Sequence, residues 1–352
     1  MRKTGVVAFA QVPPLRCEGS RVDVEMVAPV IQAVFEKSGL SRSEINFTIS
    51  GSTDFLSGIP FSFVHALDAA APWPPISESH VEMDGAWALY EAWIKIQTGE
   101  ADTALIYSFG KSSTPDNLVD LLTLQMDPYC IAPLGIDSIS LAALQAQALL
   151  NTGRYTERDF AEVVVRSRRA GLDNPCAQLK GDYEVEELLS APYVASPLRR
   201  HDCPPISDGA CAMILAGEDV ARRVCERPAW IDGFDHRVDV HQLGFRDLSL
   251  SPSTTIAAKG AGVHRDKVDL AELYAPFAHQ ELILRDAIGF KEETVINPSG
   301  GALAGNPIMS AGLIRIGEVA ERITKGEGDR GVAHATSGSC LQQNLIVVLE
   351  GE

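Results

Sequence analysis

The sequence predicts an α/β fold made of two similar halves. Continuous apolar runs such as Ala104–Phe109 and Asp208–Ala216 are typical of strands buried in a sheet. Segments with helical spacing of apolar residues, such as Val22–Lys37, lie between such runs, and after about residue 226 the alternation begins again. We therefore expect an N-terminal half at 1–225, with an insertion at about 111–207, and a C-terminal half at 226–352.

The individual elements follow from the same patterns. In the first half we expect strands at Gly5–Val12, Ile45–Ser50 and His80–Met83, and Asp84 as the cap of a helix that runs to Thr98. A Pro/Gly/Ser-rich loop joins Gly51 to Ser79, and prolines make Lys111–Asp137 irregular. In the second half we expect four strands, Ala229–Val240, Val268–Tyr274, Gly331–Ala335 and Leu345–Glu350, and helices near Thr255–Gly260, His279–Ile288 and Pro307–Ile323.

Composition narrows the classes of function. The formal net charge of −17 disfavours a nucleic-acid partner, because acidic surfaces repel phosphate backbones. Seven scattered cysteines without a Cys-x-x-Cys pair predict neither a disulfide framework nor a metal site, and they fit a reducing compartment. No apolar run is long enough to span a membrane. We expect a cytoplasmic protein.

Three stretches carry a resemblance to a known family. They are the central "RYTERDFAEVVVRSRRAGLDNPCAQLKGDYEVEELL" with "PISDGACAMILAGED", the glycine-rich "INPSGGALAGNPIMSAG", and the closing "GVAHATSGSCLQQNLIVVLE". In this order they resemble the thiolase superfamily, specifically the SCP2-type or lipid-transfer thiolase branch. The resemblance implies a five-layered αβαβα sandwich of two repeated halves. It also implies that the insertion, which covers coenzyme A in the family, is shortened here.

The chemistry of that family depends on a nucleophilic cysteine at a helix start, a histidine and a second cysteine. The resemblance puts Glu82 in the place of the first cysteine, and no cysteine occurs between residues 18 and 129. Asn306 replaces the histidine, and an amide cannot accept a proton at neutral pH. Gly338 falls in the place of the second cysteine, and Cys340 follows two residues later. All three catalytic side chains of the family are therefore expected to be missing.

Four residues remain candidates for catalysis: Tyr274, His279, Asn306 and Cys340. Tyr274 stands on the loop that faces the thiolase pocket, where a phenol can act as acid or base, or simply pack beneath the loop. His279 is either a base or a capping residue, Asn306 either an oxyanion donor or a space-filling amide, and Cys340 either a relocated thiol or an inert buried one. Backbone roles near the substrate are expected for Asn297, Gly300, Gly301, Gly305, Gly338 and Ser339.

Three functions stay open from the sequence. The first is a catalytically degenerate thiolase-like subunit, acting on acyl-CoA in sterol or fatty-acid side-chain degradation. Its partner would be an active thiolase-like paralogue or an OB-fold, zinc-ribbon protein. The second is a retro-aldol carbon–carbon lyase on a 3-hydroxyacyl-CoA that uses Tyr274. The third is an acyl or lipid carrier. Whether the chain is an enzyme is left open, no covalently bound cofactor is expected, and a coenzyme A thioester is the expected substrate.

Overall fold

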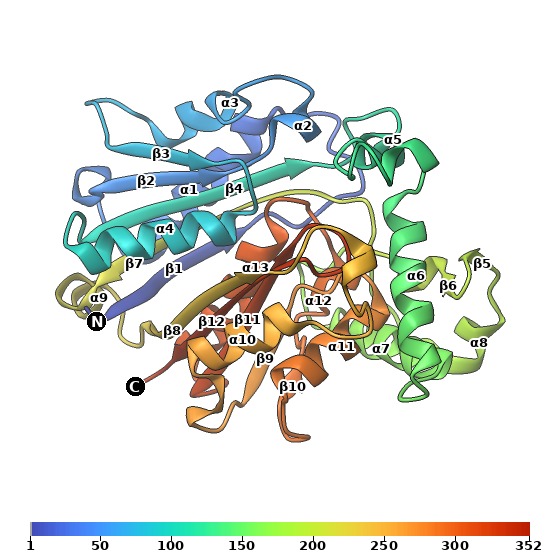
Figure 1. Cartoon of the computed structure of the whole chain (residues 1–352). Coiled ribbons are helices and arrows are strands. Elements are labelled where there is room, and N and C mark those ends of the chain that lie inside the picture. The colour runs from blue at the N-terminus through green and yellow to red at the C-terminus, as the bar shows by residue number, and fades with distance from the viewer. Residues whose placement is uncertain (1) are drawn as a thin grey trace.

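A ten-stranded sheet organises the computed structural model, which describes residues 2–352 (Figure 1). Its strand order is β10-β9-β11-β12-β8-β1-β7-β4-β2-β3. The first-half strands are β1 (Thr4–Gln11), β2 (Phe47–Gly51), β3 (Glu78–Val81), β4 (Thr103–Lys111) and β7 (Asp208–Gly217). The second-half strands are β8 (Ala229–Val238), β9 (Leu270–Leu273), β10 (Val295–Ile296), β11 (Arg330–Ser337) and β12 (Gln343–Glu350).

The sheet consists of two groups of strands with the same topology. From edge to centre, the first group runs β3-β2-β4-β7-β1 and the second runs β10-β9-β11-β12-β8. In each group the three outer strands are parallel and the two inner pairings are antiparallel. Within residues 2–352, the strands of the two groups pair with each other only at Gly5 and Val6 of β1 and Trp230 and Ala229 of β8. The expected boundary at 225/226 lies between α9 (Glu218–Val224) and β8.

Helices cover both groups and separate them. On the outer face of the first group lies α1 (Asp23–Ser38), and on that of the second lie α10 (Pro252–Ala261) and α11 (Ala278–Ile288). Between the groups, α4 (Gly85–Thr98) packs against α13 (Ala311–Thr324). Three hydrophobic clusters fill the spaces between these layers. The layers therefore run α-β-α-β-α, as the resemblance to the thiolase superfamily implies.

The insertion between β4 and β7 lies against the second half. It contains α5 (Leu118–Thr123), α6 (Ser138–Asn151), α7 (Glu157–Ala170) and α8 (Val185–Ser190), with the hairpin β5 (Tyr193–Ala195) and β6 (Leu198–Arg199). Both α6 and α7 pack on α11, and α7 also contacts α12 (Gly301–Ala304), as Figure 1 shows. Although the insertion belongs to the first half in sequence, its core is that of the second half.

Several elements differ from the sequence prediction. The segment from Gly51 to Ser79 is no simple loop, since it forms α2 (Asp54–Ser57) and α3 (Val64–Leu67). The edge strand is Glu78–Val81 rather than His80–Met83, because backbone pairing with β2 begins at Glu78 and ends at Val81. The last long helix begins at Ala311, since Ser207 forms a bridge with Pro307 and holds that residue extended. The cap at Asp84 is confirmed, because its side chain accepts a hydrogen bond from Ala86 N.

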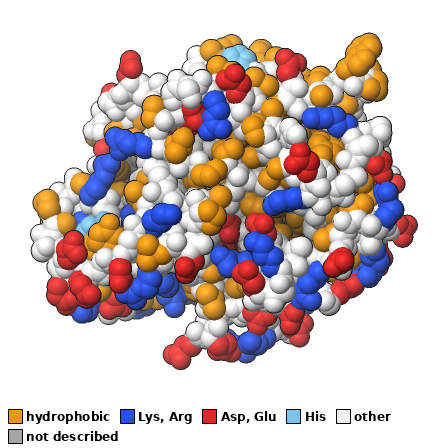
Figure 2. Space-filling view, turned by 180° about the vertical axis from the view of Figure 1, so that it is seen from behind, with side chains coloured by type: hydrophobic (Ala, Val, Ile, Leu, Met, Phe, Trp, Pro, Cys, Tyr) orange, Lys and Arg blue, Asp and Glu red, His pale blue; other side chains and the backbone are white. Residues whose placement is uncertain are grey.

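The surface carries mixed charge. On the face shown in Figure 2, acidic and basic side chains lie interspersed along the lower edge, and hydrophobic side chains gather above them. Most described arginines pair with carboxylates, for example Arg222 with Glu218 and Glu352. No helix within residues 2–352 is both long and apolar enough to cross a membrane.

Candidate active site

Two adjoining cavities lie where the insertion meets the second half. Cavity A, of about 480 Å³, is formed mainly by the connection between β1 and α1, the start of the insertion and residues 200–206. Cavity B, of about 260 Å³, is formed by α5, α6 and the loops of the second half. Both are lined by Leu122, Ser138, Pro204, Phe277, Asn306 and Ile308. The shared wall places two polar side chains, Ser138 and Asn306, at the junction of a two-chambered site.

Cavity B collects the three loops that the sequence singles out. Tyr274 comes from the end of β9, Asn306 from the glycine-rich stretch before α13, and Gly338–Gln342 from the turn between β11 and β12. The lining also includes Asp84, at the start of α4. Parallel strands bring their carboxyl ends to one edge of a sheet, which is why loops far apart in sequence meet here.

Asp84 holds the first turns of two helices. Its Oδ1 accepts from the backbone N–H groups of Ala86 (2.9 Å) and Leu313 (3.0 Å), and its Oδ2 accepts from that of Gly312 (2.8 Å). Burial raises the pKa of this carboxyl to about 6, against the opposing effect of the three N–H groups. At neutral pH the group is ionised, and one lone pair of Oδ2 is left for a ligand.

Tyr274 is a buried phenol close to that carboxylate. Its backbone N–H donates to His334 O (3.1 Å), which extends the pairing of β9 with β11 by one residue. Burial, reinforced by the negative charge of Asp84, raises the pKa of the phenol well above its ordinary value. Tyr274 therefore stays protonated at neutral pH and can act as a proton donor.

Asn306 keeps a polar atom without a partner inside the site. Its backbone N–H donates to Ser207 Oγ (2.9 Å), which fixes the residue beside the 200–206 segment. Its Oδ1 is buried and has no hydrogen-bond partner within the described residues 2–352. A buried amide without a protein partner is costly unless a ligand or water completes it. The Oδ1 acceptor is therefore available to a hydrogen-bond donor of a substrate or to water.

Buried polar contacts fix the glycine-rich loop before Asn306. Asn297 Oδ1 accepts from Leu273 N (2.6 Å), and its Nδ2 donates to Glu281 Oε2 (2.8 Å). Ser299 binds Glu272, which is itself paired with Arg315 at 2.7 Å. Gly300 and Gly301 follow with φ of 95° and 66°, a region that favours glycine. Asn297, Gly300 and Gly301 line neither cavity, and Gly305 packs against Pro14, so their expected roles near the substrate stay predictions.

Three other residues that the sequence singles out are poorly placed for catalysis. His279 lines neither cavity, because its ring is fully buried and contacts Gln145 Oε1 at 3.2 Å; burial lowers its pKa to about 3. Cys340 lines cavity B, but its Sγ donates to Leu141 O (3.5 Å) and burial raises the pKa of the thiol to about 11. Glu82 is exposed, and its carboxylate accepts from Thr53 Oγ1 and Asp54 N at the start of α2.

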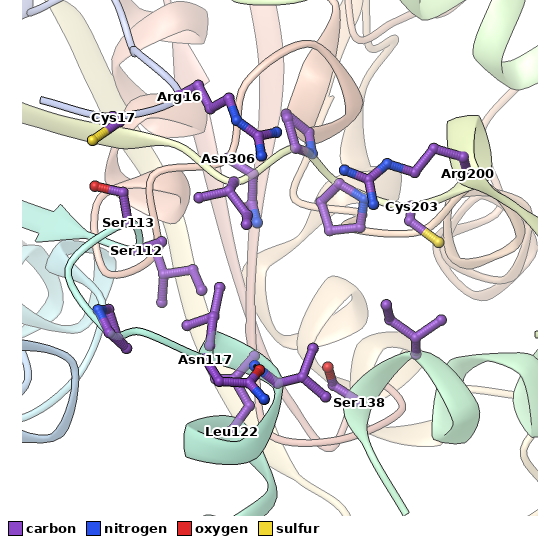
Figure 3. Close-up of a pocket in the computed structure, with 18 of the residues that line it drawn as sticks. Arg16, Cys17, Ser112, Ser113, Asn117, Leu122, Ser138, Arg200, Cys203 and Asn306 are labelled. Atoms are coloured by element: carbon purple, nitrogen blue, oxygen red, sulfur yellow. The ribbon is translucent and has the colours of Figure 1, made fainter. Parts of the chain in front are cut away.

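Cavity A has a cationic rim. Figure 3 shows the guanidinium groups of Arg16 and Arg200 pointing toward the space beside Asn306, with Ser138 and Asn117 on the opposite side. Within residues 2–352 neither arginine makes an ion pair, in contrast to most arginines of the chain. No local motif marks these two residues in the sequence, since their meeting depends on the fold of the insertion.

Comparison with known proteins finds thiolase relatives. A model of the thiolase C-terminal domain matches residues 238–349. Acetyl-CoA acetyltransferase of Methanothermobacter thermautotrophicus is 26% identical over 343 residues, covering 89% of each chain. Sterol carrier protein 2 of Bos taurus is 25% identical over 74% of this chain, which spans 54% of that protein's length.

Solved structures agree with the sequence matches. A structure titled "Ltp2-ChsH2(DUF35) aldolase" superimposes with a TM-score of 0.82 at 18% identity, covering 99% of this chain and 97% of that one. Human mitochondrial 3-ketoacyl-CoA thiolase gives a TM-score of 0.78 at 17% identity, covering 100% and 99%. The chain therefore has the thiolase fold, and its resemblance to the thiolase superfamily, including the SCP2-type relatives, is confirmed.

Proposed function

We propose that this chain cleaves a carbon–carbon bond in a 3-hydroxyacyl thioester of coenzyme A by a retro-aldol reaction. The observation that supports the proposal is the composition of cavity B, where a buried carboxylate, a buried phenol and an unpartnered amide meet. A retro-aldol cleavage requires a base for the hydroxyl group and donors for the enolate. Unlike thiolysis, it needs no thiolate.

The three side chains divide the reaction between them. Asp84 removes the proton of the 3-hydroxyl group, the C2–C3 bond breaks, and C3 leaves as a carbonyl compound. The electron pair of the broken bond enters the thioester as an enolate, whose oxygen accepts a hydrogen bond from the Nδ2 group of Asn306. Tyr274 then donates a proton to C2, and the proton held by Asp84 restores the phenol. Each group ends in its starting protonation state.

Thiolysis is disfavoured by the state of the thiols. The start of α4 carries Asp84 and no cysteine. The thiol of Cys340 donates a hydrogen bond to a backbone carbonyl, and burial raises the pKa of this thiol. A thiol that stays protonated at neutral pH is a weak nucleophile. Asn306, in the place of the family's histidine, cannot serve as its base.

Cavity A suits the coenzyme A part of the substrate. Coenzyme A carries phosphate groups, and the unpaired guanidinium groups of Arg16 and Arg200 stand on the cavity's rim. The apolar lining, including Ile139, Ile206 and Phe277, suits the less polar arm that leads to the thioester. The acyl group would then extend past Asn306 into cavity B.

The experiment is an assay of the purified chain with two substrates. With a 3-hydroxyacyl-CoA, we expect a shortened acyl-CoA and an aldehyde or ketone in equal amounts, identified by mass spectrometry. With acetoacetyl-CoA and free coenzyme A, we expect no thiolysis. Thiolytic turnover coupled to labelling of Cys340 by a haloacetyl-CoA would contradict the proposal.

A second candidate is a degenerate subunit that supports an active partner in sterol or fatty-acid side-chain degradation. It is favoured by the sheet edge, where β3 has no neighbour on its outer side within residues 2–352 and the preceding segment exposes Phe61 and Trp73 (68% and 88% accessible). The neighbour titled "Ltp2-ChsH2(DUF35) aldolase" also names two proteins together. The partner would be a thiolase-like paralogue or an OB-fold, zinc-ribbon protein.

Co-purification separates the two candidates. A supporting subunit should be unstable or aggregate when expressed alone and should recover with its partner. A chain that forms a stable, monodisperse homodimer and cleaves the thioester by itself would rule out the supporting role.

A further inference from the structure

The turn Gly338–Gln342, which lines cavity B between β11 and β12, has an unusual backbone. Gly338, Cys340 and Leu341 have φ of 75°, 54° and 59°. Glycine adopts this left-handed region freely, but each residue with a side chain pays about 1–2 kcal/mol there. Two such residues in succession persist only where the surroundings hold them.

Four of the five carbonyl groups of the turn, those of Ser339–Gln342, accept hydrogen bonds from residues outside it. The guanidinium of Arg246 donates through Nη1 to Ser339 O (3.0 Å) and through Nη2 to Cys340 O. Cys340 O also accepts from Gln145 Nε2 (3.3 Å). Leu341 O accepts from Asn344 Nδ2 and Gln342 O from Asp239 N, each at 2.8 Å.

The N–H groups of the same turn have no such partners. Within residues 2–352, the backbone N–H groups of Ser339, Cys340, Leu341 and Gln342 donate to no protein acceptor. The turn is therefore one-sided: its acceptors are occupied, and its donors are left for a ligand. Donors in this state beside a reacting thioester can stabilise an oxygen that gains negative charge.

The side-chain contacts of Arg246 are with this turn. Within residues 2–352 it makes no ion pair with a carboxylate, and partial burial lowers the pKa of its guanidinium. Its Nη1 and Nη2 groups donate to two successive carbonyls, a geometry that lysine cannot reproduce. Gln145, fully buried behind the turn, supports the same carbonyl of Cys340. The hydrogen bonds from Arg246 thus stabilise a left-handed backbone conformation that glycine would adopt without such support.

We propose that Arg246 is a positioning residue for the reaction in cavity B. By holding the carbonyls of Ser339 and Cys340 away, it keeps the backbone N–H groups of Cys340 and Leu341 free for the thioester oxygen as the enolate forms. The expected effect on kcat rests on the proposed retro-aldol function. The expected effect on the order of the turn rests only on the contacts described above.

The kinetic test compares Arg246→Met and Arg246→Lys with Arg285→Met as a control. Arg285 also lacks an ion pair, but it lies on α11 outside both cavities. We expect kcat to fall about 10- to 100-fold in Arg246→Met, less in Arg246→Lys, and KM to change by less than about 3-fold in both. A KM effect with unchanged kcat, or an equal loss in the control, would overturn the positioning role.

A second measurement does not depend on turnover. Amide hydrogen exchange of peptides that cover residues 336–344 should become faster in Arg246→Met and stay unchanged in Arg285→Met, while the thermal midpoint shifts by only a few degrees. If the wild-type chain cleaves no 3-hydroxyacyl-CoA, the proposed function fails and exchange alone decides the matter. Unchanged exchange at this turn in Arg246→Met would then overturn the inference.

Discussion

The two halves share a strand order, but the helix that follows the edge strand begins differently in each half. In the first half β3 leads directly into α4, and Asp84 caps that helix. In the second half a glycine-rich loop and α12 separate β10 from α13, whose own N-cap residue, Ser310, makes no side-chain cap. Asp84 supplies the missing cap across the interface. One carboxylate thus serves both halves and leaves the loop of the second half free to line cavity B.

The largest effect should come from removing this shared carboxylate. In Asp84→Ala two helix starts lose their cap, so we expect a loss of about 2–4 kcal/mol in the free energy of unfolding. Turnover should fall at least about 100-fold, the scale of a lost general base. Denaturant unfolding and the cleavage assay measure the two effects.

Asp84→Asn separates the cap from the base. The amide keeps the size of the side chain and one acceptor oxygen, so most of the stability should return while turnover stays low. An Asn variant that is as active as the wild type would show that Asp84 is structural only.

Tyr274→Phe tests whether the phenol of Tyr274, in the second half, takes part in the reaction. The side chain keeps its ring and its place in the small cluster with Ala302 and Ala311, so the fold should be little affected. If the phenol protonates C2, turnover should drop by about 100-fold or more. Turnover within a few-fold of normal in the presence of a partner would instead favour the supporting-subunit role.

The contrast between the halves also shows how far the sequence could be read. The cap at Asp84 was predictable, because a cap and its helix are adjacent in the chain. Its second role was not, because Gly312 lies 228 residues away and no spacing rule links the two. His279 was a candidate base because it follows Tyr274 closely, but α11 turns it toward the core. Arg16, Arg200 and Arg246 carry no local motif and become visible only in three dimensions.

A pH profile should give a further, graded effect. Burial raises the pKa of Asp84 to about 6, so the carboxylate is charged above that pH and protonated below it. Since the proposed base must be ionised, kcat should be constant near neutral pH and decline as the pH falls through about 6. In Asp84→Asn this acidic limb should disappear from the residual activity. A limb that persists unchanged would assign it to another group.

Glu82 should matter more for assembly than for turnover. In the chain its carboxylate binds Thr53 and Asp54, beside the open edge of β3. Two copies related by a two-fold axis at this edge would bring like charges together, so we predict a heteromeric contact here. Glu82→Lys should weaken that assembly in size-exclusion chromatography, and Glu82→Gln should preserve it. A stable homodimer of the wild-type chain would contradict this prediction.

The smallest effect should come from the thiol of Cys340, which lines cavity B. Cys340 donates a hydrogen bond to Leu141 O, and a serine hydroxyl can make the same contact. The unusual backbone at this position is held by its carbonyl and not by its sulfur, so Cys340→Ser should leave the turn in place. We therefore expect turnover within about 3-fold of the wild type, because a thiol with a pKa near 11 contributes little thiolate at neutral pH. A loss of about 100-fold would place the sulfur in the chemistry after all, and the site would then be a thiolase with a relocated nucleophile instead of a lyase built on Asp84 and Tyr274.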